Sequence, residues 1–192
     1  MSESFSVSTS ACVSEDRRSL LSAAVGMLLP AALPAGVAAG LSSGLSAPAW
    51  ALEPKQSPPD LDIGGGQRLS ALGGKVIYID FWASWCGPCR QSFPWLNTMQ
   101  KRYGEQGLVV IGINLDEKQK DADEFLAQVP ASFKLMFDPT GSSAKRFGVT
   151  GMPTSVLVGA DGKVVQVHSG FRPEQRVELE QRLVAALSAR RP

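Results

Sequence analysis

Two cysteines separated by two residues, Cys86 and Cys89, are the residues of this chain best suited to chemistry. Apolar side chains follow them at helical spacing, at Phe93, Leu96 and Met99. Cys86 is therefore expected at the start of a helix, with Cys89 about one turn further on. Positions i and i+3 lie on one face of a helix, close enough for a disulfide bond. The pair can be oxidised and reduced without moving the backbone.

The position of Cys86 also predicts its reactivity. The N-terminus of a helix carries a partial positive charge and unpaired N–H groups, which stabilise a thiolate. Such a site lowers the pKa of a cysteine from about 8.5 to about 3.5–7.5. Cys86 is therefore the predicted nucleophile, and Cys89, deeper in the helix, the resolving thiol.

The elements around the cysteines follow from the hydrophobic pattern. An apolar, β-branched run at residues 76–80 predicts a buried strand, which a short aromatic turn connects to Cys86. The helix is expected over residues 87–103 with a kink at Pro94, and a second apolar run at 108–115 predicts another strand. A strand-helix-strand unit of this kind implies right-handed, parallel pairing.

Further elements are expected on both sides of this unit. A short hairpin is predicted over 61–69, and an Asp-Gly turn at 161–162 joins two strands of a second hairpin. The remaining predictions are helices at 118–129 and 142–147, a short strand at 135–137, strands at 154–158 and 164–168, and a last helix opened by Pro173.

Three stretches of the sequence carry a resemblance to a known family: residues 80–83, residues 85–89 and Pro94 resemble the active-site strand and helix of thioredoxin. The pair Phe93-Pro94, with later features, is similar to the TlpA/ResA family of thiol-disulfide oxidoreductases. The resemblance implies an α/β thioredoxin fold, a central mixed β-sheet flanked by helices. Helix 118–129 corresponds to the insertion of that family.

The resemblance also implies roles for individual residues. Asp80 stands at the position of the buried thioredoxin carboxylate, the proton acceptor for Cys89. Met152 and Pro153 match a loop in which the proline is cis and faces the cysteines. Because Pro153 has no N–H, the Met152 backbone is left free to pair with an extended substrate.

Trp85, Gly87 and Pro88 complete the expected substrate-binding surface, with Trp85 expected to be exposed and Trp82 to lie in the core. The dipeptide Gly87-Pro88 resembles that of reducing thioredoxins and favours a reductase. The protein is expected to need no cofactor beyond the Cys86/Cys89 disulfide and no metal.

At two positions the chain departs from its nearer relatives. These often have asparagine where this chain has Asp80, and glutamate where it has Ser92. The departure favours proton handling of the thioredoxin type. A surface or merely hydrogen-bonded role for Asp80 stays open.

The expected partners are protein disulfide substrates and an upstream membrane thiol that donates electrons. The family resemblance implies substrates such as cytochrome c haem-site or oxidase copper-site thiols. The protein is expected to act as a monomer. A net charge of +1 over 192 residues gives no reason to expect nucleic acid.

Other functions remain open. A zinc half-site would require further ligands, for which the chain offers Cys12 and His168. His168 also permits comparison with Sco-type copper proteins, although the cysteine spacing differs. A non-catalytic module for metal delivery or chaperone-like binding could use the same groove and thiols. A peroxidase is disfavoured because its Pro-x-x-x-Thr-x-x-Cys motif is missing.

The first 51 residues resemble an export signal. Arg17-Arg18 precedes a short apolar run at 20–29, and Ala49-Trp50-Ala51 fits a cleavage site. The arginine pair resembles a twin-arginine signal, and ordinary secretion or an uncleaved membrane anchor are alternatives. We expect a periplasmic or exported protein with a linker at 52–59 and a thioredoxin domain at 60–192.

Overall fold

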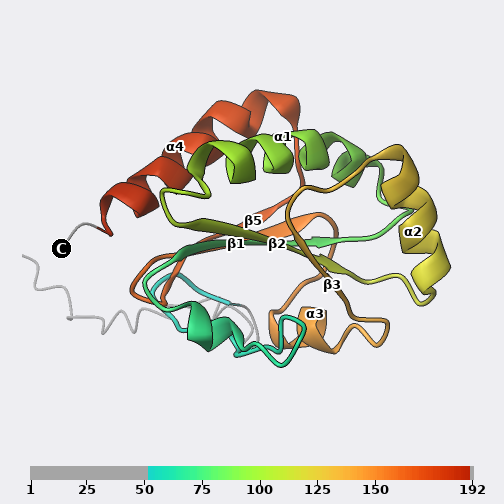
Figure 1. The fold of residues 1–192 in the computed structure, drawn as a ribbon, viewed down its shortest axis with the longest axis horizontal. Helices are drawn as coiled ribbons and strands as arrows, with labels where there is room; N and C mark the ends of the chain where they lie inside the picture. The colour runs from blue at the N-terminus through green and yellow to red at the C-terminus, as the bar shows by residue number, and fades with distance from the viewer. Residues whose placement is uncertain (1–51, 191–192) are drawn as a thin grey trace, which may run out of the picture. The chain divides into compact units, whose positions relative to one another are not determined.

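The computed structural model describes residues 52–190, and the predicted export signal lies outside them. Five strands form one sheet in the order β3-β2-β1-β4-β5, which Figure 1 shows edge-on between layers of helices. Strand β1 pairs in parallel with β2 and antiparallel with β4. The outer pairs are β2 with β3, parallel, and β4 with β5, antiparallel. The sheet is therefore mixed, as predicted. The strands are β1 (Val76–Trp82), β2 (Leu108–Asn114), β3 (Lys134–Phe137), β4 (Thr154–Val158) and β5 (Val164–Ser169).

The helices lie on both faces of this sheet. Helices α1 and α4 cover one face together, and α3 lies on the other with the short 3-10 helix η1, whereas α2 lies at one end of the sheet (Figure 1). Glu180 of α4 accepts a hydrogen bond of 2.6 Å from Tyr103 of α1. The bounds are η1 (Leu69–Leu72), α1 (Gly87–Tyr103), α2 (Gln119–Gln128), α3 (Ser142–Arg146), η2 (Pro173–Gln175) and α4 (Arg176–Ser188).

The predicted elements all occur, with two differences. Phe81 and Trp82 belong to β1 and not to a turn, because β2 and β4 pair with them. Pro173 opens the short 3-10 helix η2, and α4 begins only at Arg176.

Strand β1 is buried on both faces, so its side chains alternate between two cores. Tyr78 and Trp82 belong to the core under α1 and α4, together with both cysteines. Ile79 and Phe81 belong to the opposite core, against η1 and α3. Because successive side chains of a strand point to opposite faces, Asp80 points toward α1 and α4.

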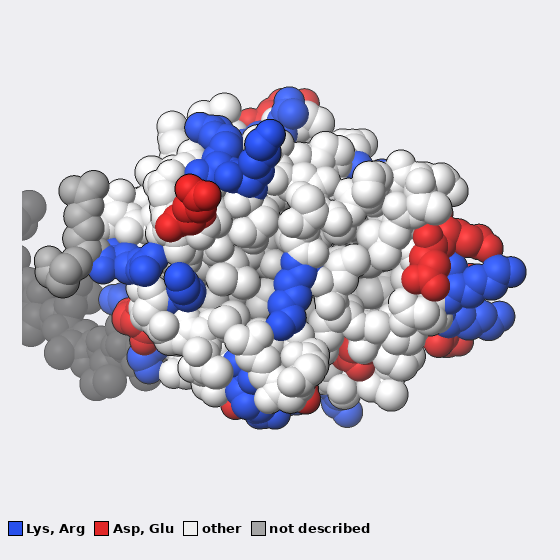
Figure 2. Space-filling view, in the orientation of Figure 1, with Lys and Arg blue, Asp and Glu red and all other residues white. Residues whose placement is uncertain are grey.

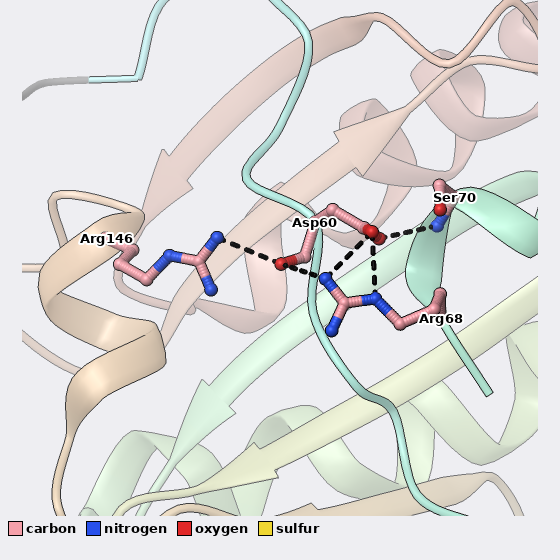
Figure 3. A network of polar contacts seen from close by, with 4 residues as sticks. All are labelled: Asp60, Arg68, Ser70 and Arg146. Atoms are coloured by element: carbon pink, nitrogen blue, oxygen red, sulfur yellow. Dashed lines mark hydrogen bonds and ion pairs between the residues drawn. The ribbon is translucent and has the colours of Figure 1, made fainter. Parts of the chain in front are cut away.

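Polar contacts hold the stretch around Asp60, which begins the predicted domain, against the elements that follow it. Asp60 accepts hydrogen bonds from Arg68 Nε and the Ser70 N–H, both of 2.9 Å, and Arg146 donates to the Asp60 carbonyl oxygen at 2.9 Å (Figure 3). The expected hairpin over 61–69 is present, with an isolated antiparallel bridge between Asp62 and Arg68.

The predicted linker 52–59 also contacts the domain. The Lys55 N–H donates to the Val164 carbonyl oxygen at 2.7 Å, and the Val164 N–H donates to the Gln56 carbonyl oxygen at 2.8 Å. This stretch therefore adds a turn beside β5 and is not simply extended. Its boundary with the domain stays a prediction.

Acidic and basic groups are interspersed on the face shown in Figure 2, including the end where α2 lies. On α2, Lys120 and Glu124 form an ion pair of 3.6 Å. Between residues 52 and 190 no helix has the length and apolar character needed to cross a membrane.

Candidate functional site

A disulfide bond joins Cys86 and Cys89 at the connection between β1 and α1. Cys86 is the N-cap residue of α1, and its Sγ accepts a hydrogen bond of 3.3 Å from the Cys89 N–H. Pro88 lies in the first turn, where its missing N–H costs no hydrogen bond. The two Cα atoms are 5.3 Å apart, as a disulfide requires. The predicted placement of both cysteines is thus confirmed.

Solvent reaches the two cysteines to different degrees. Cys86 is 3% exposed and Cys89 is fully buried. Trp85, directly before Cys86, is 72% exposed, whereas Trp82 is buried in the core. An incoming molecule therefore meets Trp85 and Cys86 first, and Cys89 lies behind them.

The loop before β4 lies beside this turn. The Met152–Pro153 peptide bond is cis. Thr154, the next residue, pairs with Phe81 of β1, so the loop adjoins the end of the strand that leads to the cysteines. Met152 packs against the core cluster that contains both cysteines. Within residues 52–190 its backbone forms no hydrogen bond and is free to pair with another chain.

Asp80 is buried on the face of β1 that α1 covers, and it is 1% exposed. The Ser155 hydroxyl of β4 donates to Asp80 Oδ1 at 2.8 Å. The other carboxylate oxygen, Oδ2, has no hydrogen-bond partner among the described residues. Burial raises the pKa of Asp80 to about 7, and the Ser155 hydrogen bond opposes this rise. A surface position for Asp80 is thereby excluded, and the carboxyl group titrates near neutral pH.

A second buried carboxylate, Asp116, was not predicted from the sequence. It accepts hydrogen bonds from the Ser84 N–H at 2.9 Å, the Ser84 hydroxyl at 2.9 Å and Asn114 Nδ2 at 2.7 Å. Asp116 thus anchors the turn that leads into Cys86. The sequence did contain a signal for this role: Asp116 is a polar residue just after a buried strand, at the end of the sheet where β1 also ends.

The insertion helix α2 also contributes to the site. Arg90 of α1 lies over the Phe125 ring, 4.8 Å from its centroid, and donates to Gln128 Oε1 at 3.1 Å. A hollow of about 240 Å³ lies here, and Trp85 and Glu124 are among the residues that line it. Helix α2 therefore forms one wall of the surface beside Trp85.

The metal alternatives gain no support from the described residues. Between residues 52 and 190 no group of three or more His, Cys, Asp or Glu side chains is placed to hold a metal ion. Cys12 lies outside the described residues. His168 is on β5, opposite Ser155 in the register of the sheet.

The profile of the redoxin family matches residues 54–183. The chain is 33% identical over 111 residues to a protein of Bacillus thuringiensis subsp. konkukian named thiol-disulfide oxidoreductase ResA. That alignment covers 58% of this chain and 64% of the relative, so it spans less than two thirds of the ResA protein.

Solved structures agree in fold. A crystal structure from Chlorobium tepidum, provisionally named thiol:disulfide interchange protein DsbE, is 51% identical and superimposes with a TM-score of 0.68. The match covers 71% of this chain and 99% of that chain. DsbF from MTB is 27% identical, with a TM-score of 0.56, over 69% of this chain and 95% of that chain. The thioredoxin fold predicted from the sequence is therefore confirmed.

Replacing Asp116 with alanine should loosen the turn before Cys86. The Ser84 N–H and the Asn114 amide would lose their buried acceptor, which predicts a loss of about 2–3 kcal/mol in the free energy of unfolding. Urea unfolding measures this loss. Asp123→Ala, on the exposed side of α2, is the matched control and should change stability by less than about 0.5 kcal/mol. Equal stability of the two variants would contradict the anchoring role.

Replacing Asp80 with asparagine should stabilise the oxidised protein at alkaline pH. The folded carboxyl group takes up a proton below about pH 7, whereas its reference pKa is 3.8, so the parent loses stability as pH rises between these values. The interval corresponds to roughly 4 kcal/mol at most. Urea unfolding at pH 4.5 and pH 8 should show the variant's advantage growing with pH. An advantage independent of pH would contradict the raised pKa.

Proposed function

The chain belongs to the redoxin family, and from this premise we propose that it is a thiol-disulfide oxidoreductase that reduces disulfide bonds of exported proteins. One observation carries the proposal most directly. Cys86 and Cys89 form a disulfide at the N-terminus of α1, with Cys86 as the N-cap residue. This geometry suits a pair of thiols that is oxidised and reduced in place.

The reaction begins with the reduced pair. The Cys86 thiolate, stabilised by the N-terminus of α1, attacks one sulfur of a substrate disulfide. A mixed disulfide forms between Cys86 and that sulfur, and the other substrate sulfur leaves as a thiolate. The Cys89 N–H, which donates to Cys86 Sγ at 3.3 Å in the oxidised protein, is placed to lie beside this mixed disulfide.

Cys89 completes the reaction after losing its proton. Its thiolate attacks Cys86 Sγ, which restores the Cys86–Cys89 disulfide and releases the second substrate sulfur as a thiolate. Cys89 is fully buried, so water is a poor acceptor for its proton. Asp80 is buried on the same side of β1, and its Oδ2 has no hydrogen-bond partner within residues 52–190, so it is the proposed acceptor. An upstream dithiol then returns two electrons to the protein.

Substrate binding is proposed at the surface formed by Trp85, Gly87, Pro88, Met152 and Pro153. The Met152 backbone offers a donor and an acceptor to an extended peptide, as an added strand would use them. Trp85 provides an exposed apolar surface beside Cys86. Gly87 carries no side chain, so the approach to the disulfide is not obstructed between the cysteines.

The proposal also includes the direction of the reaction and the class of substrates. The Gly87-Pro88 dipeptide supports reduction, and the resemblance to ResA-type proteins supports cytochrome c or copper-site maturation as the setting. A second candidate is a non-catalytic module that delivers metal or binds substrate through the same thiols. Turnover with a disulfide substrate, compared with metal titration of the reduced protein, separates the two.

The proposal that the protein is exported rests on the sequence of residues 1–51. The basic pair, the short apolar run and the Ala-x-Ala end support a secretory signal and a periplasmic or exported protein. A membrane-associated form with an uncleaved leader is the alternative. We propose that the mature protein acts as a monomer.

The cysteine variants test the reaction. With a dithiol as reductant, the protein from Leu52 onward should reduce a protein disulfide. Cys86→Ser should abolish this, because the remaining thiol, Cys89, is fully buried and cannot attack a substrate. Cys89→Ser should instead accumulate a mixed disulfide, visible as a covalent adduct by mass spectrometry. Undiminished turnover without Cys86 would overturn the assignment of the nucleophile.

The Asp80→Asn variant tests the proton acceptor. Attack by Cys86 should keep its rate, whereas release by Cys89 should slow by about 10²–10⁴, the contribution typical of a general base. In the parent, release should itself decline as pH falls through about 7, since Asp80 then becomes protonated. Rapid-quench analysis at pH 6 and pH 8 follows the mixed disulfide. Equally fast resolution by variant and parent at pH 6 would remove Asp80 from the mechanism.

The leader is tested in the native organism. N-terminal sequencing of the purified protein should find Leu52 as the first residue, because cleavage is expected after Ala51. Recovery of the full-length chain in the membrane fraction would instead support the uncleaved anchor.

A further inference from the structure

A row of three polar side chains crosses the sheet beneath α1 and α4. Asp80 of β1 pairs with Ser155 of β4, and Ser155 pairs with His168 of β5. Directly paired residues of antiparallel strands point to the same face, with Cβ atoms about 4.5–5.5 Å apart. The row therefore leads from the central strand to the edge strand of the sheet.

The outer half of this row borders a small cavity. The cavity has a volume of about 10 Å³, at the lower limit of the roughly 10–15 Å³ that a cavity needs to hold one water molecule. Four of its lining side chains can donate or accept hydrogen bonds, which suits a bridging water. The lining residues are Tyr78, Ser155, Leu157, Gln166, His168 and Leu179.

Two buried atoms along the row lack hydrogen-bond partners among residues 52–190: Asp80 Oδ2 and His168 Nε2. Buried polar atoms of folded proteins are paired in the great majority of cases. Two exceptions flank one serine hydroxyl, which already donates to the Asp80 carboxylate. His168 lines the cavity, and as a residue it is only partly buried, on a strand at the edge of the sheet.

The proposed reaction creates a need that this row can meet. Each turnover leaves the proton of Cys89 on the Asp80 carboxyl group, which is buried. That proton can return to Cys89 when the disulfide is reduced again. In a reduced molecule whose Asp80 is already protonated, however, the proton must leave for solvent before Asp80 can accept one from Cys89. The elements around Asp80 provide few groups for this: β2 contributes Gly112 opposite it, α4 contributes Leu179 to the cavity, and Tyr78 is held neutral because burial and the Asp80 charge raise its pKa.

We propose that Ser155 and His168 relay the proton of Asp80 to solvent at the edge of the sheet. The proposal rests on the proposed function, since it concerns the proton that resolution by Cys89 produces. The protonated carboxyl group gives its proton to Ser155 Oγ. Ser155 passes its own hydroxyl proton to His168 Nε2, directly or through one water in the cavity. His168 then releases a proton to solvent from its other ring nitrogen, Nδ1. Asp80 ends ionised and Ser155 ends unchanged, whereas His168 ends in its other tautomer and returns to the first by proton exchange before it can act again.

Ser155 and His168 are positioning residues in this scheme, because neither touches the sulfur atoms that react. Imidazole suits the outer position because it can accept a proton at one ring nitrogen and release one from the other. Ser155 has a second role at equilibrium, since its hydrogen bond favours the ionised carboxylate. Its loss should raise the pKa of Asp80 further.

The test measures resolution by Cys89 in single turnover with a disulfide peptide, between pH 5.5 and pH 8.5. The parent should release reduced peptide in one exponential phase. In His168→Ala and in Ser155→Ala, molecules that begin with a protonated Asp80 must wait for slow proton loss. Below about pH 7 the trace should therefore split into a fast phase and a phase at least about 10-fold slower.

Rescue distinguishes a relay from a structural role. Added 4-methylimidazole should accelerate the slow phase of His168→Ala in proportion to its concentration, and Ser155→Thr, which keeps the hydroxyl, should behave as the parent. Ser169→Ala removes an exposed hydroxyl from the same strand as His168 and is the matched control, expected to be unchanged.

Three outcomes would overturn the relay. One is a single phase at the parent rate in both variants. Another is a slowing that is uniform across the pH range and is not rescued by 4-methylimidazole, which indicates a structural role. The third is a parent that releases no reduced peptide at any pH, which refutes the proposed function and the relay with it. A parent that is active while the variants match it refutes the relay alone.

Discussion

The burial of an ionisable carboxyl group in the middle of the central strand is the constraint on which the site depends. Asp80 lies between apolar neighbours on a strand that is buried along its whole length. Its ionised form receives one side-chain hydrogen bond, from Ser155, and burial opposes its charge. An asparagine of the same shape would avoid that cost. The acid is therefore better explained by chemistry than by packing, because only the acid can hold and release a proton.

The topology of the sheet explains why segments far apart in the sequence meet at the cysteines. Strands β1 and β2 are parallel, so Asp116, just after β2, lies next to the turn that follows β1. Strand β4 runs antiparallel to β1, so its first residues lie beside the last residues of β1. The cis-proline loop, which precedes β4, therefore lies at the end of the sheet where β1 leads into the cysteines. Asp116 depends on the pairing of β1 with β2 and the loop on the pairing of β1 with β4, so the complete site requires both.

Patterns within single segments predicted the elements and the cysteine site, because helix and strand periods are local properties of the sequence. The pairing of Asp80 with Ser155 was not predictable in this way. It depends on the register of two strands 75 residues apart, and a shift of one residue turns every side chain of a strand to the other face. The role of Asp116 was not predicted for the same reason, since its partner Ser84 is 32 residues away. Phe81 and Trp82 were assigned to a turn because the strands that pair with them lie later in the chain.

The hydrogen bond from the Ser155 hydroxyl to Asp80 sets a balance between the stability of the fold and the ability of Asp80 to accept a proton. A second donor at Oδ2 would favour the carboxylate and lower its pKa toward the ordinary value, which would stabilise the fold at neutral pH. Such a carboxylate would be a weak base toward a buried thiol, whose ordinary pKa is about 8.5. With no donor at all, burial would keep the acid protonated well above neutral pH, and it would seldom be able to accept a proton. One donor, with the other oxygen unpaired, holds the pKa near 7, in the range where a general base is most effective at physiological pH. The same oxygen, which has no hydrogen-bond partner among residues 52–190, therefore weakens the folded state and suits Asp80 to the proton transfer that we propose for it.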